Sequence, residues 1–156
     1  MSRWLLIGLF LGFLLASCTP LTPIISQAPQ ATPTAASLGD WFLHMNQTGG
    51  IMGLHRSVEI SSDGQMTVTD ERTKKTVTVQ LNDDDLARLK TMLSTMAYTD
   101  FKSPTVCADC FIYDLSVDRG SGKPLTITLD DMSLEGSGLS DLISLVRGLM
   151  DKALQS

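Results

Sequence analysis

The most reactive side chains of the sequence lie in the segment CADC, where Cys107 and Cys110 are separated by two residues. A redox-active pair of this kind opens a helix whose dipole lowers the thiol pKa, but the residues that follow, FIYDLSVD, alternate as in a β-strand. A zinc site would need two further ligands, and the chain has only His44 and His55 to offer. We therefore expect a local disulfide that stiffens this loop. Redox catalysis, zinc binding and two free thiols are the alternatives.

The stretch TGGIMG at residues 48–53 places three of the chain's twelve glycines within six residues. It lacks a lysine and the spacing of a phosphate-binding loop, so nucleotide binding is not predicted. With residues 49 and 50 at the centre of a hairpin, His44 would lie opposite His55 on a polar face. Ile51 and Met52 would then be either a staple onto the core or exposed anchors for a partner.

Aspartates form two further clusters, at residues 83–85 and 130–131. The first is typical of a helix start, where carboxylates favour the positive end of the dipole, and the second of the turn before a second helix. Neither offers the regularly spaced oxygen ligands of a calcium loop. GxSxG and HExxH motifs are absent, and no cysteine is placed with a partnered histidine. We predict a non-enzyme with no catalytic residue, no metal, no cofactor and no small-molecule substrate.

The elements that must position these residues follow from the hydrophobic period. Period-two segments separated by turn residues predict strands at Trp41–Asn46, Leu54–Ser61, QMTVTD, TVTVQL, Phe111–Asp118 and LTITL. Apolar residues at steps of three and four predict helices over residues 83–97 and 139–154, the first capped by Asn82. One antiparallel sheet of five or six strands with two amphipathic helices on its apolar face, an α+β fold, accounts for this pattern.

The first residues predict a lipoprotein signal at 1–17. Arg3 precedes an apolar run of about a dozen residues, shorter than the roughly twenty of a spanning helix. The segment LASC that ends at Cys18 resembles the lipobox of bacterial lipoproteins. This resemblance implies that Cys18 begins the mature chain and carries acyl chains, which together give stable membrane anchoring. An uncleaved helix is the alternative.

Residues 18–38 follow as a tether, and residues 39–156 are long enough for one domain. The tether is rich in proline, threonine and alanine and carries no charge, so it cannot bury enough apolar surface to fold. Cleavage after Ser17 leaves 11 basic residues against 17 acidic ones, a net charge of −6. This charge disfavours nucleic acid and anionic membrane surfaces as partners.

Several short motifs of the domain resemble those of emfourin, a small proteinaceous inhibitor of protealysin. The matching residues are Thr48, Gly49, Gly50, Ile51 and Gly53 in the glycine stretch, Asp109, Phe111 and Tyr113 after it, and the Leu139–Leu149 helix. The similarity spans about residues 43 to 150. It implies an α+β fold and inhibition of thermolysin-like zinc metalloproteases, which favour a large apolar side chain just after the scissile bond.

Together these patterns predict a lipid-anchored protein of the cell membrane or outer membrane, with its domain in the periplasm or exterior. The expected partners are the bilayer, through acylated Cys18, and a thermolysin-like metalloprotease. The contact surface would be the loop 48–54, with Met52 beside the matched residues, together with the segment around 102–110. A non-catalytic envelope lipoprotein that binds another protein or has a structural role is the alternative.

Overall fold

The strands of the domain form one sheet around β1, which pairs with a neighbour on each side. The computed structural model describes residues 39–96, 101–102, 107–120 and 123–156. In the order β4-β3-β2-β1-β6-β7-β5, the sheet contains β1 (Phe42–Gly49), β2 (Leu54–Ser61), β3 (Gln65–Asp70), β4 (Lys75–Gln80), β5 (Phe101–Lys102), β6 (Phe111–Asp118) and β7 (Leu125–Asp130). All neighbours are antiparallel except β5, which pairs parallel to β7 over two residues.

Two of the helices, α1 and α2, begin at good capping residues. In α1 (Asp83–Thr95), the Asn82 side chain accepts a hydrogen bond from the Asp85 backbone N–H, so the aspartates at 83–85 lie in the first turn as predicted. The short helix α2 (Asp131–Leu134) starts with a capping box, in which Asp130 and Ser133 each bond the other's backbone. The long helix α3 (Ser140–Gln155) ends the chain.

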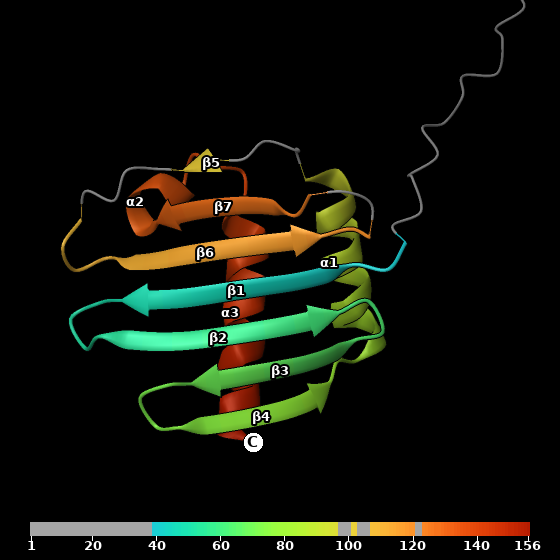
Figure 1. The fold of residues 1–156 in the computed structure, drawn as a ribbon, viewed down its shortest axis with the longest axis horizontal. Helices are drawn as coiled ribbons and strands as arrows, with labels where there is room; N and C mark the ends of the chain where they lie inside the picture. Colours follow the sequence, from blue (N-terminus) through green and yellow to red (C-terminus); the bar gives the residue numbers. More distant parts are fainter. Residues whose placement is uncertain (1–38, 97–100, 103–106, 121–122) are drawn as a thin grey trace, which may run out of the picture. The chain divides into compact units, whose positions relative to one another are not determined.

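The predicted α+β class is confirmed, with six antiparallel strands and the two long helices against one face. Figure 1 shows α1 and α3 behind the sheet, while the face towards the viewer carries no helix of the described part of the chain. The sequence did not predict β5 or α2, because two and four residues are too short for a periodic pattern. Residues 35–156 form a compact unit that contains the whole hydrophobic core, so this segment can be produced and tested alone.

Two rows of apolar side chains cross the covered face of the sheet. The strand register places in one row Val79, Met66, Ile60, Leu43, Val117 and Leu125, and in the next Val77, Val68, Val58, Met45, Leu115 and Ile127. The buried stripes of α1 and α3 complete the core above them. Period-two alternation thus places most apolar residues of the strands on one side, where the helices exclude water, while Phe42 and Ile112 lie on the other face.

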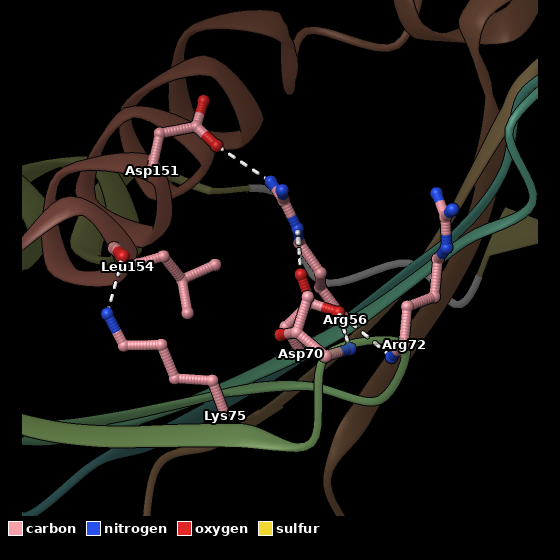
Figure 2. A network of polar contacts seen from close by, with 7 residues as sticks. Arg56, Asp70, Arg72, Lys75, Asp151 and Leu154 are labelled. Carbon is pink, nitrogen blue, oxygen red and sulfur yellow. Dashed lines mark hydrogen bonds and ion pairs between the residues drawn. The ribbon is translucent and has the colours of Figure 1, made fainter.

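The third row on the same face is mostly polar. Lys75, Asp70, Arg56, Gln47, Tyr113 and Leu129 lie side by side across the six antiparallel strands. Its cations meet the C-terminal end of α3: Arg56 Nη1 lies 2.8 Å from Asp151 Oδ1, and Lys75 Nζ donates to the Leu154 carbonyl at 2.7 Å (Figure 2). Positive side chains stabilise this end of a helix, where carbonyls lack partners.

Asp70 joins this polar row to the β3–β4 turn. Only 6% of the residue is exposed, and its carboxylate accepts hydrogen bonds from the backbone N–H groups of Arg72 and Thr73 as well as from Arg56 Nε, as Figure 2 shows in part. Burial acts to raise the pKa of Asp70, but these hydrogen bonds and the Arg56 charge outweigh it and hold the pKa below its ordinary value.

Asp70→Asn should therefore destabilise segment 35–156 in a pH-dependent way. Because the folded-state pKa is depressed, the ionised carboxylate stabilises the fold above its unfolded pKa of about 4, and this stabilisation is lost as the pH falls through the folded value. We expect the free energy of unfolding to drop by about 2 kcal/mol at pH 7. The difference from the wild type should shrink below pH about 4.

Urea unfolding at several pH values measures this effect. Glu71→Gln is the control, since Glu71 forms only an exposed ion pair with Lys74 and its loss should cost less than about 0.5 kcal/mol. A pH-independent cost for Asp70→Asn would show that its carboxylate charge does not stabilise the fold.

Candidate functional site

The glycine stretch forms the connection between β1 and β2, but with a different centre from the one predicted. Gly49 remains in the strand opposite Leu54, and the Gly53 N–H donates to the Gly50 carbonyl at 2.9 Å, which closes a four-residue turn. Ile51 and Met52 are its two central residues. The prediction that residues 49 and 50 centre the hairpin is therefore wrong.

The histidine pairing changes with this register. His44 lies opposite Glu59, and His55 lies opposite Thr48. Because Thr48 and His44 are separated by an even number of residues, both histidines still share the face of the sheet away from α3, as expected. They do not face each other, because the hairpin is centred two residues further along the chain than predicted.

The disulfide segment braces the glycine turn from the other side. Cys107 and Cys110 form the predicted disulfide, with their Cα atoms 5.4 Å apart, and the Cys110 carbonyl accepts a hydrogen bond of 3.1 Å from the Gly50 N–H. A Cβ atom on Gly49 would collide with this carbonyl, and one on Gly50 would lie 2.6 Å from the Phe111 ring. Both glycines also have positive φ. Any other residue would therefore be unfavourable at either position for two reasons, the backbone conformation and the close neighbouring atoms.

The tip of the turn projects two large apolar side chains into solvent. Ile51 is 88% exposed and Met52 is 73% exposed. The staple alternative is therefore wrong, since neither side chain packs into the core. Exposed adjacent apolar residues on a braced turn are typical of an anchor for a partner.

The start of β6 is held by Asp131 of α2. Its carboxylate accepts hydrogen bonds from the Phe111 N–H at 2.8 Å and from the Tyr113 hydroxyl at 2.9 Å. Burial, with this hydrogen bond to Asp131, raises the pKa of the Tyr113 hydroxyl, which therefore stays protonated. The sequence assigned Asp130 and Asp131 to a turn, and the structure adds that Asp131 fixes the strand next to the glycine turn.

A pocket of about 380 Å³ opens beside the turn, on the face of the sheet that α3 covers. Its lining includes Ile51 and Met52, and also Gln47, Arg56, Arg72 and Arg147. The sequence patterns predict no role for these four polar residues, which come from β1, β2, the β3–β4 turn and α3. The only signal was that Gln47 and Arg56 occupy inward positions in otherwise apolar strand patterns.

The four residues considered as zinc ligands do not gather into one site in the described part of the chain. The sulfurs of Cys107 and Cys110 are bonded to each other, and the two histidines lie on the far face of β1 and β2. In the part of the chain that the structure describes, no three His, Cys, Asp or Glu side chains gather as metal ligands would. No helix in those same ranges is long and apolar enough to cross a membrane.

The remaining predicted sites lie outside the described residues. These are the signal at 1–17, the lipidated Cys18, the tether at 18–38 and most of the segment before Cys107. No model of a known protein family matches the chain, and no curated protein matches it either. The likeness to emfourin thus rests on the short motifs of the glycine stretch, β6 and α3.

The bracing of the turn predicts different costs for substitutions at two of its glycines. Gly49→Ala and Gly53→Ala both place a side chain at positive φ, but only Gly49 would also meet the Cys110 carbonyl, whereas nothing lies within 4 Å of a Cβ at Gly53. We expect Gly53→Ala to cost about 1 kcal/mol and Gly49→Ala about 3 kcal/mol in free energy of unfolding. Thermal or urea unfolding of segment 35–156 measures both, and equal costs would contradict the bracing contact.

Proposed function

We propose that this chain is an extracytoplasmic lipoprotein, anchored through Cys18, whose domain binds and inhibits thermolysin-like metalloproteases without being an enzyme itself. The observation that carries the proposal is the exposure of Ile51 and Met52 at the tip of a braced turn. The motif resemblance to emfourin supplies the class of partner.

The turn has the physical properties of an inhibitory loop. Its conformation is fixed by the Gly50–Cys110 hydrogen bond, the adjacent disulfide and the pairing of Gly49 with strands on both sides. A loop that is already ordered loses little conformational entropy when it binds. Ile51 or Met52 would fill the protease pocket that receives a large apolar side chain after the scissile bond, and its burial would contribute roughly 2 kcal/mol.

The same exposed pair would also suit a non-catalytic envelope lipoprotein that binds a different protein. The two functions differ in one respect that can be measured. An inhibitor slows a thermolysin-like protease, whereas an assembly module leaves its rate unchanged. The protease assay therefore separates them.

Ile51→Asp and Met52→Asp should weaken inhibition while leaving the fold intact. Because both side chains are exposed, neither substitution removes a core contact. A carboxylate at the anchoring position would have to be desolvated in an apolar pocket, so the more important of the two substitutions should raise the inhibition constant about 100-fold or more. The measurement is the hydrolysis rate of a peptide substrate by a thermolysin-like protease, titrated with segment 35–156.

Ala87→Asp is the matched control, because Ala87 is exposed on α1, which lies at the other end of the sheet from the turn in Figure 1. It adds the same charge without touching the proposed surface and should inhibit like the wild type. Absence of inhibition by the wild type at micromolar concentration would refute the proposed activity. Full inhibition by the variant with both aspartates would refute the role of the turn.

Cys18→Ser should prevent acylation of the full chain in a bacterial host. Palmitate labelling of the wild type should be lost in this variant, since serine has no thiol for the lipid transfer. The variant should also keep the mass of the uncleaved chain. Cys107→Ser with Cys110→Ser is the control and should label normally; label that persists in Cys18→Ser would exclude Cys18 as the anchor.

A further inference from the structure

The side chain of Gln47 lines the pocket beside the glycine turn and forms no hydrogen bond with another described residue. The residue is only 4% exposed. Its amide nitrogen and oxygen are not among the unpaired side-chain atoms that the described structure closes off from solvent, so both can be reached from the pocket. The Gln47 amide therefore offers one donor and one acceptor side to a molecule in the pocket.

The walls around Gln47 are positively charged in a chain of net charge −5. Three arginines and one aspartate are the charged residues of the lining. Arg56 is held by Asp70 and Asp151, but the guanidinium of Arg72 has no ion pair in the described structure, and Figure 2 shows it directed away from Asp70. An unpaired guanidinium beside a pocket favours an anionic ligand, above all one with the planar geometry of a carboxylate.

Arg147 supplies a second cation for such a ligand. Its guanidinium lies 5.6 Å from the centroid of the Phe111 ring and 5.7 Å from that of Tyr113. These rings fix the orientation of the guanidinium without neutralising its charge. None of the ion pairs in the described residues involves Arg147, so its hydrogen-bond donors are available on the pocket side.

The rest of the lining is apolar. Ile51, Met52 and Leu54 come from the turn and the start of β2, and Phe111 comes from the start of β6. A ligand here would therefore place an apolar group against the turn and an anionic group near the arginines. The volume of about 380 Å³ lies within the range of sites for small ligands or single side chains.

We propose that this pocket binds the free C-terminal end of a peptide or protein whose last residue is apolar. The terminal carboxylate would pair with Arg72 and Arg147, and the last side chain would contact Ile51, Leu54 and Phe111. In an extended peptide the N–H and the carbonyl of the residue before the last point the same way, so together they match the two halves of the Gln47 amide. The carboxylate of a fatty acid offers acceptors only and would form no hydrogen bond with the Gln47 carbonyl.

This site is separate from the proposed inhibition and does not depend on it. Inhibition uses the outward tips of Ile51 and Met52, whereas peptide binding uses the inner wall of the turn and the row of polar residues behind it. A domain that inhibits no protease would still bind the peptide end, and the two proposals fail independently.

Binding of N-acetyl-Ala-Leu to segment 35–156 tests the proposal, followed by the amide NMR spectrum and by calorimetry. We expect saturable binding at peptide concentrations up to roughly 1 mM, with the largest shifts at Gln47 and Gly50–Leu54. The same peptide with a C-terminal amide should bind at least about 10-fold more weakly, because it lacks the charge that pairs with the arginines. N-acetyl-Glu-Leu-amide tests whether an acidic side chain replaces the terminal carboxylate, and it should also bind weakly.

Two variants separate the roles of charge and amide. Arg72→Met and Gln47→Leu should each raise the Kd for the acid peptide about 10-fold or more, whereas Arg88→Met on the exposed face of α1 should leave it unchanged. Arg72 is exposed, so its variant keeps the fold, and thermal unfolding checks the Gln47 variant. Equal binding of acid and amide peptides, tighter binding of decanoate or inorganic phosphate, or no shift at 1 mM peptide would overturn the proposal.

Discussion

The position of α3 across the sheet determines the rest of this structure, because the helix crosses the strands and runs along the rows of inward side chains (Figure 1). Two rows of inward side chains lie under the buried stripes of the helices and are apolar throughout. The third row lies beside α3. At β2 and β4 it meets the last turns of the helix through Arg56 and Lys75, and at β6 the Tyr113 ring lies against Arg147. Polar side chains can occupy inward positions there because they meet polar groups of α3 instead of a dry core.

The glycine turn lies beside this polar row, and its rigidity follows from the central position of β1. Gly49 pairs with Leu54 on one side and with Phe111 on the other, so the chain leaves the sheet from a strand that is held on both sides. The disulfide segment then approaches so closely that only glycine fits at residues 49 and 50. Because the backbone is fixed by neighbours and not by its own side chains, Ile51 and Met52 are free to face solvent.

The sequence predicted the parts of the fold that depend on repeated local patterns. Each long strand and helix has several periods of alternation, and the Asn82 cap and the CxxC spacing are local signals. The hairpin centre was wrong because two adjacent glycines suit a two-residue turn as well as the longer one, and only the contact with Cys110 decides between them. The pocket was missed for a related reason. Gln47, Arg56, Arg72 and Arg147 come together only through strand register and helix packing, neither of which leaves a pattern in a single segment.

One regularity in the sequence does anticipate this polar row. In β1, β2 and β3 the same row of inward positions is polar, as Gln47, Arg56 and Asp70 respectively, while the next two inward residues of each strand away from the glycine turn are apolar. A single polar residue at a strand end is unremarkable, since strands end in solvent. Three neighbouring strands change from apolar to polar inward residues in the same row of the sheet. Because the register aligns these residues side by side, the three changes imply a shared cause. Two of these residues, Gln47 and Arg56, line the pocket beside the glycine turn. The exposure of the turn alone is weak support for a binding function. Its position beside the polar row of the sheet is the stronger support.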